Sequence, residues 1–156
     1  MNLLQLVGSI ALCQAVGISG AFFTAKAIPS WYKKLKKPSF NPPNWIFGPV
    51  WTLLYTLMGI VLYRLWQLEP STAGRSLVLM FFFVQLGLNA IWTPLFFGLK
   101  ALWPAFVEIL FMLAAILATT YQLTQVDGLS AWLMLPYLLW VSFAALLNYS
   151  LAKLNA

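Results

Sequence analysis

The side chains best suited to chemistry in this sequence are indoles, phenols and amides that recur at helical spacing. They form three sets, each spaced to share one face of a helix: Trp51 with Tyr55; Gln85 with Asn89 and Trp92; and Trp140 with Ala144 and Asn148. Aromatic rings can stack on a flat molecule, and amides can hydrogen-bond to its polar groups. We therefore expect these residues to line one cavity with aromatic walls.

Composition excludes most catalytic and metal chemistry. The 156 residues contain no histidine, one cysteine and three acidic residues. A Ser/His/Asp triad, a Cys/His dyad, a zinc cluster and a disulfide framework therefore cannot form, and we expect no metal site. The single Cys13 belongs to a series of small residues at every fourth position, which lets another helix approach closely: Ser9, Cys13, Gly17, Ala21 and Ala25.

Glu108 is the one acidic residue placed well inside an apolar stretch. An ionised carboxylate there costs at least ~2.5 kcal/mol, so we expect Glu108 to be protonated or well bonded and to face other helices. Two roles stay open, namely binding a polar group of a ligand or bonding to a neighbouring helix. A proton or ion pump needs a chain of ionisable groups across the membrane, and one acid does not provide it.

The elements that must position these side chains are transmembrane helices. The chain is 62% hydrophobic and 8% charged, with a mean hydropathy of +0.85, whereas a soluble domain carries about 25% charged residues. A membrane-crossing helix needs about 20 apolar residues. Five stretches qualify, which predicts an all-α five-helix bundle forming a single membrane domain, residues 1–156, with helices at about 3–25, 46–66, 77–99, 101–123 and 131–151. Pro94 and Pro136 lie within two of them and are expected to kink their helices.

The basic residues predict the orientation of this bundle. Arg64 and Arg75 fall on the side of the N-terminus, and seven lysines fall on the side of the C-terminus: Lys26, Lys33, Lys34, Lys36, Lys37, Lys100 and Lys153. The positive-inside rule then places the N-terminus outside and the C-terminus in the cytoplasm; the sequence does not assign the membrane. These lysines flank spans and are expected to contact lipid headgroups rather than nucleic acid.

The one long connection, residues 26–45, is predicted to cover the cavity as a lid. It carries Trp31, Tyr32 and five of the lysines, and Pro42 and Pro43 impose an extended path into the second span. Counted at 1.5 Å per residue from the lysine-rich side, Trp51 lies about 8 Å deep and Asn89 about 15 Å deep. The cavity is therefore expected in the cytoplasmic half of the bundle, and the lid has membrane-surface anchoring as its alternative role.

Several motifs together carry a family resemblance over nearly the whole chain. They are Trp31-Tyr32, Lys37-Pro38-Ser39, Pro42-Pro43-Asn44-Trp45, Phe47-Gly48-Pro49-Val50-Trp51-Thr52, Leu54-Tyr55, the segment from Asn89 to Gly98, Pro136-Tyr137, Trp140, Phe143-Ala144 and Leu147-Asn148-Tyr149. In these features the sequence resembles the TspO/MBR family, which comprises the tryptophan-rich sensory proteins of bacteria and the translocator protein, or peripheral benzodiazepine receptor, of mitochondria.

The resemblance implies a five-helix bundle, often a homodimer, that binds porphyrins such as protoporphyrin IX and haem, sterols and benzodiazepine-type ligands, with no obligatory cofactor. The positions matching the family pocket are Trp31, Tyr32, Trp51, Asn89, Trp140 and Ala144, to which spacing and depth add Tyr55, Trp92, Glu108 and Asn148. Leu147, Tyr149 and Lys153 fit the loose cholesterol-recognition pattern.

Three functions remain in competition. The leading one is a membrane receptor or sensor that binds tetrapyrroles in the pocket, with lysines near the mouth attracting the propionates. The second is transport of porphyrin or sterol. The third is light-dependent porphyrin breakdown, in which Trp31 and Trp140 would react with the excited pigment and oxygen, since no paired carboxylates, histidine base or metal ligands are available.

Overall fold

The computed structural model describes all residues, 1–156, and consists of five long helices. They are α1 (Leu3–Ala27), α2 (Phe47–Gln67), α3 (Arg75–Thr93), α4 (Leu102–Val126) and α5 (Gly128–Leu154), with short turns η1 (Tyr32–Lys34), η2 (Asn44–Ile46) and η3 (Pro94–Gly98). Each helix is long and apolar enough to cross a membrane, α2 together with η2 and α3 together with η3. The predicted all-α five-helix class is confirmed.

The connections differ from the expected ones at the last three helices. The third span is an α-helix only to Thr93, after which Pro94 begins the five-residue π-helical turn η3. The fourth helix continues through its polar end to Val126, and Asp127 alone separates it from α5. Hydropathy marks only the apolar part of a helix, so these polar ends were missed. α5 continues through Pro136 as one helix.

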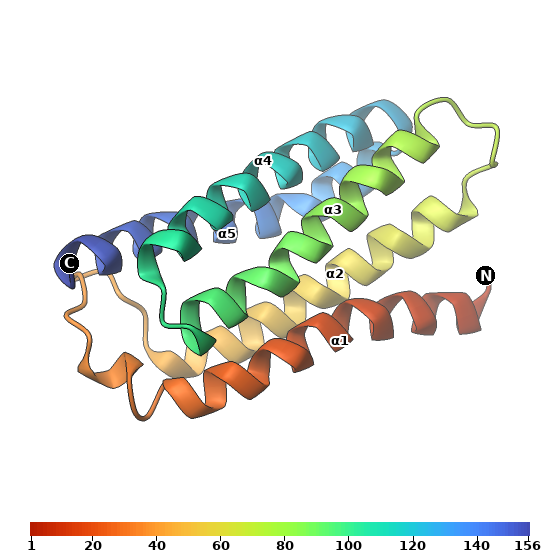
Figure 1. The fold of residues 1–156 in the computed structure, drawn as a ribbon. Helices are drawn as coiled ribbons and strands as arrows, with labels where there is room; N and C mark the ends of the chain where they lie inside the picture. The colour runs from red at the N-terminus through yellow and green to blue at the C-terminus, as the bar shows by residue number, and fades with distance from the viewer.

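The chain ends and connections fall at two ends of the bundle, as five spans require. The α1–α2 loop, η3 and the C-terminus lie at one end, and the N-terminus with the α2–α3 and α4–α5 connections lies at the other (Figure 1). We call the first the lysine-rich end and the second the opposite end. Around the bundle, α1 packs against α2 and α3, α2 also packs against α5, and α4 packs against α3 and α5.

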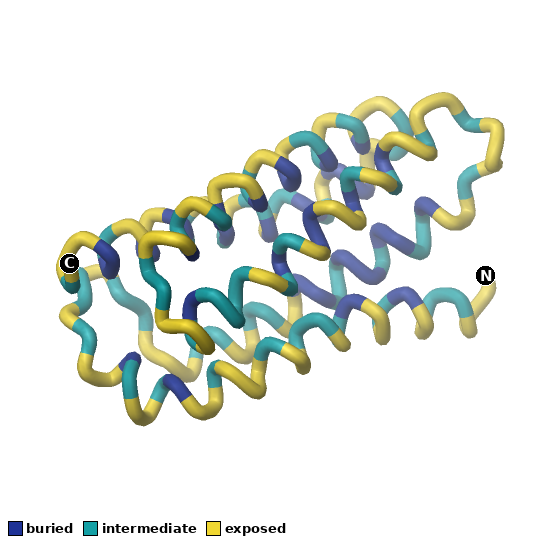
Figure 2. Tube along the Cα trace, viewed as in Figure 1, coloured by how far each residue is buried: buried dark blue, intermediate teal, exposed yellow.

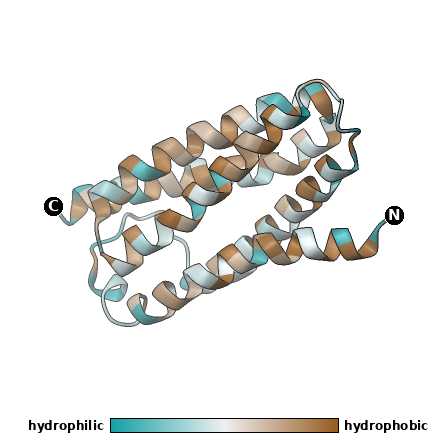
Figure 3. Ribbon diagram, turned by 45° about the vertical axis from the view of Figure 1, so that its right-hand side comes forward, coloured by the Kyte–Doolittle hydropathy of each residue, from teal (hydrophilic) through white to brown (hydrophobic).

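The outer surface of the bundle is apolar. Large hydrophobic side chains stand outward along the helices, including Phe22 and Trp132, each 71% exposed, and Phe111, 62% exposed. Hydrophobic residues cover the helices and hydrophilic ones gather near the connections (Figure 3). Such a surface matches hydrocarbon rather than water as its solvent.

The packed core lies away from the lysine-rich end. The buried residues of α2 begin only at Leu54, and a cluster of 19 buried residues joins α2 to α3, α4, α5 and Cys13 of α1 (Figure 2). α1 and α2 nearly touch there, because a Cβ on Gly59 would lie 2.4 Å from the Cα of Ile10. The first seven residues of α2 therefore leave space beside them that the core does not fill.

An ion pair ties the opposite end together. Arg64 on α2 donates two hydrogen bonds to the Asp127 carboxylate, at 2.8 and 2.9 Å. The Ser130 hydroxyl donates a third at 2.5 Å. Two effects act on the pKa of Asp127: hydrogen bonding from Arg64 lowers it, and burial raises it. The hydrogen bonding is the larger effect, so the pKa lies below its usual value. The turn between α4 and α5 is thus fastened to α2.

Candidate functional site

A cavity of about 420 Å³ occupies the lysine-rich end. It lies between α1, α2, the end of α3, η3 and α5, under the α1–α2 loop, and no charged side chain lines it. Its aromatic lining residues number nine: Tyr32, Phe47, Trp51, Tyr55, Trp92, Phe96, Phe97, Trp140 and Phe143. The size is within the 300–1,000 Å³ usual for small-molecule sites, and the walls suit a flat apolar molecule.

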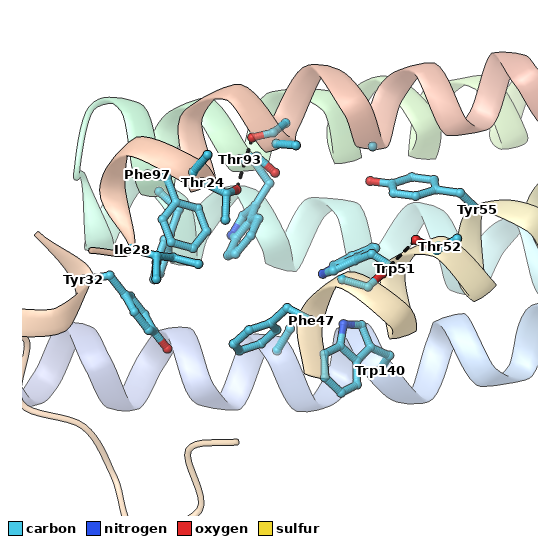
Figure 4. A pocket seen from close by; sticks show the side chains of 18 of the residues that line it. Thr24, Ile28, Tyr32, Phe47, Trp51, Thr52, Tyr55, Thr93, Phe97 and Trp140 are labelled. Atoms are coloured by element: carbon cyan, nitrogen blue, oxygen red, sulfur yellow. Dashed lines mark hydrogen bonds between the residues drawn. The ribbon is translucent and has the colours of Figure 1, made fainter. Parts of the chain in front are cut away.

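Aromatic pairs fix the orientation of the walls. Trp51 stacks on Tyr55 with ring centroids 5.5 Å apart and an interplanar angle of 28°. Phe47 meets Trp140 edge-on at 6.0 Å. Figure 4 shows Trp51, Phe47 and Trp140 grouped on one side of the space, across from Phe97. The rings support one another, so the cavity is formed without a ligand.

A buried polar network lies beneath the cavity. The Tyr55 hydroxyl donates to Asn89 Oδ1 at 2.6 Å, Asn89 Nδ2 donates to the Tyr137 hydroxyl at 2.8 Å, and that hydroxyl donates to Gln85 Oε1 at 2.7 Å. Tyr55 alone of these four residues lines the cavity. Asn89 therefore holds the floor in position from below and does not itself line the space.

Close approach of α1 completes the floor. A Cβ on Gly17 would lie 2.5 Å from the Tyr55 ring, so only glycine lets α1 pack on that ring. Next to it, Gln14 Nε2 donates to the Thr52 carbonyl at 3.0 Å and to the Thr56 hydroxyl at 2.9 Å, joining α1 to α2.

A second amide orients the wall made by α3. Trp92 Nε1 donates to Asn148 Oδ1 at 3.1 Å, and Asn148 Nδ2 donates to the Leu102 carbonyl at 3.0 Å. Both polar groups of the Asn148 amide are thereby used. The Trp92 ring, fixed in this way, stacks on Phe96 at 4.9 Å.

Trp140 carries a free polar group at the cavity. Its ring lines the space, yet its buried Nε1 has no hydrogen-bond partner in the protein. Buried N–H groups are almost always paired. The indole N–H is therefore an unpaired donor buried beside the cavity.

The α1–α2 loop closes the cavity through Tyr32, which is 2% exposed. Its hydroxyl donates to Asn41 Oδ1 at 3.0 Å, and Lys37 Nζ lies 4.8 Å from the centroid of its ring. Burial raises the pKa of Tyr32. The predicted lid segment 26–45 overlaps α1, which continues to Ala27. From here on, "lid" means residues 28–43.

The lid is also tied to the end of α5. Asn155 Oδ1 accepts from the Lys36 backbone N–H at 2.9 Å, and Asn155 Nδ2 donates to the Lys36 carbonyl at 2.9 Å. Both hydrogen bonds join positions 119 residues apart in the sequence. We call this pairing the Asn155 clasp.

The cavity opens sideways between two helices. Its exposed lining residues all belong to α1 and α2: Ile18, Ala21, Ala25, Gly48 and Thr52. The other lining residues are buried or half-buried. A ligand could thus reach the cavity from the side of the bundle, at the level of the membrane.

The structure brings together most of the residues singled out from the sequence. The ones that line the cavity are Tyr32, Trp51, Tyr55, Trp92, Trp140, Ala144, Asn148 and Leu147. Trp31 does not; its ring lies behind the wall, edge-on to Phe96 at 5.8 Å. Of the two tryptophans considered for photochemistry, only Trp140 therefore faces the space.

Glu108 lies outside the lining, half-buried on α4, and both carboxylate oxygens are buried without a hydrogen-bond partner. The residues of the cholesterol-type pattern do not share a surface. Leu147 faces the cavity, whereas Tyr149 is 37% exposed and packs against Trp103 and Phe106. Lys153 Nζ lies 5.8 Å from the Tyr149 ring on that outer side.

The contribution of α1 was missed from the sequence. The series of small residues was interpreted as a surface for helix packing. Ser9 and Cys13 are buried in this way, whereas Gly17, Ala21 and Ala25 line the cavity. Phe47, Phe96, Phe97 and Phe143 were also missed. Their one signal was position, since each lies within five residues of a lining tryptophan.

Comparison with known proteins identifies relatives along the full chain. Residues 9–154 match the TspO/MBR family. The chain is 46% identical to the tryptophan-rich protein TspO of Archaeoglobus fulgidus over 156 residues, all of both chains. It is 38% identical over 146 residues to a tryptophan-rich sensory protein of Cereibacter sphaeroides, covering 94% of this chain and 88% of the relative. It is 41% identical over 126 residues to the human translocator protein, covering 80% and 75%. This five-helix membrane protein belongs to the TspO/MBR family.

Proposed function

We propose that this protein is a membrane receptor or sensor that holds a tetrapyrrole, such as protoporphyrin IX or haem, in the cavity at its lysine-rich end. The observation that carries the proposal is the set of nine aromatic side chains around about 420 Å³ of space, with no charge among the lining residues. A porphyrin ring is flat and apolar, and such rings gain from offset stacking on indole and phenol faces.

The periphery of the ligand is matched by the surroundings of the cavity. The propionates of a porphyrin are anionic, and the lid presents Lys33, Lys34, Lys36 and Lys37 at the covered end of the space. No acidic residue lies on the lid or lines the cavity: Glu69 and Asp127 are at the opposite end, and Glu108, on α4, is outside the lining. The positive potential therefore favours a ligand that carries carboxylates on its lid side.

A titration with protoporphyrin IX in detergent tests the proposal through absorbance or tryptophan quenching. Each of Trp51→Ala and Trp140→Ala removes a ring from the wall and is expected to weaken binding about tenfold, or ~1.4 kcal/mol. Trp132→Ala is the matched control, since Trp132 is on α5 as Trp140 is but stands outward, 71% exposed. Unchanged affinity in both cavity variants, or an equal loss in the control, would contradict the assignment.

We also propose that the lysine-rich end lies in the cytoplasm. Seven of the nine basic residues are at this end, and the positive-inside rule favours the cytoplasmic side for them. A membrane-impermeant thiol reagent tests it on intact cells. A cysteine introduced by Ala156→Cys is expected to stay unlabelled and one introduced by Asn2→Cys to be labelled, while Cys13 is buried and stays silent. The reverse pattern would invert the orientation.

Transport is the second candidate, and the sideways opening between α1 and α2 favours it. A ligand dissolved in the bilayer could enter and leave there without crossing water. The core below Tyr55 is filled, so the path does not continue to the other leaflet. We therefore expect any transfer to stay within one leaflet; protein-dependent movement of porphyrin between leaflets of reconstituted liposomes would refute this.

A further inference from the structure

A second hollow lies on the outer side of the lysine-rich end. It measures about 580 Å³ and is formed where the end of α1 meets η3 and the turn into α4. Phe97 lines both this hollow and the cavity, so one ring separates the two spaces. Five of its lining residues decide what it can bind: Phe23, Lys26, Gly98, Leu99 and Lys100. We call the hollow the α1–η3 groove.

Two cations share this groove without an acidic partner. Lys26 and Lys100 both line it, and the one ion pair of the protein is that of Arg64 with Asp127 at the opposite end. Like charges that share a site repel unless an anion lies between them. The groove therefore presents an uncompensated binding place for an anionic group.

The backbone at Lys100 directs the chain out of η3 and into α4. Its φ of 57° is in the left-handed region, and no other residue besides glycine has a positive φ in this chain. That conformation costs a side-chain-bearing residue roughly 1–2 kcal/mol, and glycine would relieve it. The hydrogen bond from the Ala101 N–H to the Leu95 carbonyl, 3.0 Å, holds this left-handed residue as the end of the helical turn. It fixes where Lys100 leaves η3 and so keeps this lysine at the groove.

Apart from Ser30, the rest of the groove wall carries no polar side chain, and part of it is exposed. Leu99 is 73% exposed and Phe23 is 40% exposed. Phe23 lies close over Gly98, whose missing side chain makes room for the ring, since a Cβ there would lie 2.8 Å from it. A molecule that fits needs an anionic head for the lysines and a hydrocarbon tail for this wall.

We propose that the α1–η3 groove is a binding site for one anionic phospholipid, with its phosphate between Lys26 and Lys100 and an acyl chain along Phe23 and Leu99. A zwitterionic lipid fits less well, because its own ammonium group competes for the phosphate charge. A free phosphate offers the head without the tail. The groove is separate from the aromatic cavity, so the proposal does not depend on what that cavity binds.

Native mass spectrometry of the detergent-solubilised protein, titrated with phosphatidylglycerol, phosphatidylcholine or glycerol phosphate, tests the site. Each lysine is expected to contribute about fivefold in affinity for phosphatidylglycerol, or about 1 kcal/mol. Lys26→Gln with Lys100→Gln should thus weaken its binding about 25-fold and remove its preference over phosphatidylcholine. The charge-matched control combines Lys36→Gln with Lys153→Gln, two exposed lysines outside the groove.

Each outcome decides the question. Loss in the groove variant with retention in the control supports the site, as does weak binding of glycerol phosphate to the unmodified protein. Equal loss of phosphatidylglycerol affinity in both variants would show that only the net charge of the protein matters, and would refute a defined site. Equally tight binding of glycerol phosphate would show a phosphate site and remove the lipid from the proposal. Leu99→Ser checks the tail contact, because it should weaken phosphatidylglycerol binding and leave glycerol phosphate unaffected.

Discussion

Removal of the Asn155 clasp is expected to loosen the lid without disturbing the bundle. Asn155→Ala deletes both hydrogen bonds to Lys36, each 2.9 Å long, and a third to the Leu151 carbonyl at 2.8 Å. The lid keeps the buried Tyr32 and its hydrogen bond to Asn41. The variant therefore isolates the tie between lid and helix end.

The magnitude follows from the two lost hydrogen bonds to the lid. A neutral hydrogen bond contributes about 0.5–1.5 kcal/mol, and these exposed ones belong at the lower end of that range. Together they stabilise the closed lid by about 1–2 kcal/mol, which is roughly a 5- to 30-fold change in the population of the open lid. Asn44→Ala is the control, since Asn44 adjoins the lid and its side chain makes no hydrogen bond to the rest of the protein.

Limited trypsin digestion measures this population, because cleavage after Lys33, Lys34 or Lys36 requires the lid to open, whereas the bond after Lys37 precedes Pro38 and resists trypsin. When opening and closing are fast relative to cleavage, the rate follows the open fraction. Cleavage after Lys153 reports separately on fraying of α5. A lid cleavage rate for Asn155→Ala equal to that of Asn44→Ala would refute the reasoning and leave burial of Tyr32 as the fastening.

Two further predictions concern the floor of the cavity and the opposite end. Gly17→Val should displace the Tyr55 ring, because a Cβ at that position would lie 2.5 Å from it, and should weaken porphyrin binding at least tenfold in the titration. Gly8→Val is the control, since a Cβ there meets nothing within 4 Å, and it should leave porphyrin binding unchanged. Equal effects of the two variants would contradict the contact. The lowered pKa of Asp127 means that its contribution to stability is complete above the ordinary value of 3.8 and is lost as the pH falls through the lower folded value. Thermal unfolding in detergent should therefore show Asp127→Asn less stable by about 1 kcal/mol at neutral pH, with the difference vanishing in acid; a difference that persists in acid would exclude the ion pair as its cause.

Hydropathy and helical spacing together were enough to predict the architecture and the end that holds the cavity. Lipid as solvent makes every span apolar over about 20 residues, so five spans follow from the sequence. Trp51, Tyr55 and Trp140 line the cavity as depth and shared faces indicated. Depth and helical face do not distinguish a residue that lines a cavity from one directly beneath it. Asn89 was therefore predicted to line the wall, but it lies in the hydrogen-bond network under Tyr55.

Contacts between distant segments were beyond prediction. The role of Asn155 depends on the lid reaching the end of α5, 119 residues away in the sequence. The small residues on α1 share one spacing but lie in two environments, the packed core and the cavity. This is because α1 and α2 are in contact at Gly59 and separate beyond Gln14. Spacing is identical along the whole series, and only the crossing of the helices decides which of its residues pack and which face space.

The two ends of the bundle differ in packing, and Tyr55 is the residue at which they meet. Its ring forms the cavity floor and stacks on Trp51, while its hydroxyl donates into the buried network through Asn89. Below it the core is filled, and the Arg64–Asp127 pair closes the opposite end. Helices around an empty space lose packing contacts there. This bundle therefore depends on the packing contacts at its filled end. The filled end thus supplies the stability that permits the hollow one. α1 buries only Ser9, Cys13 and Ala27 and is held mainly by its crossing with α2.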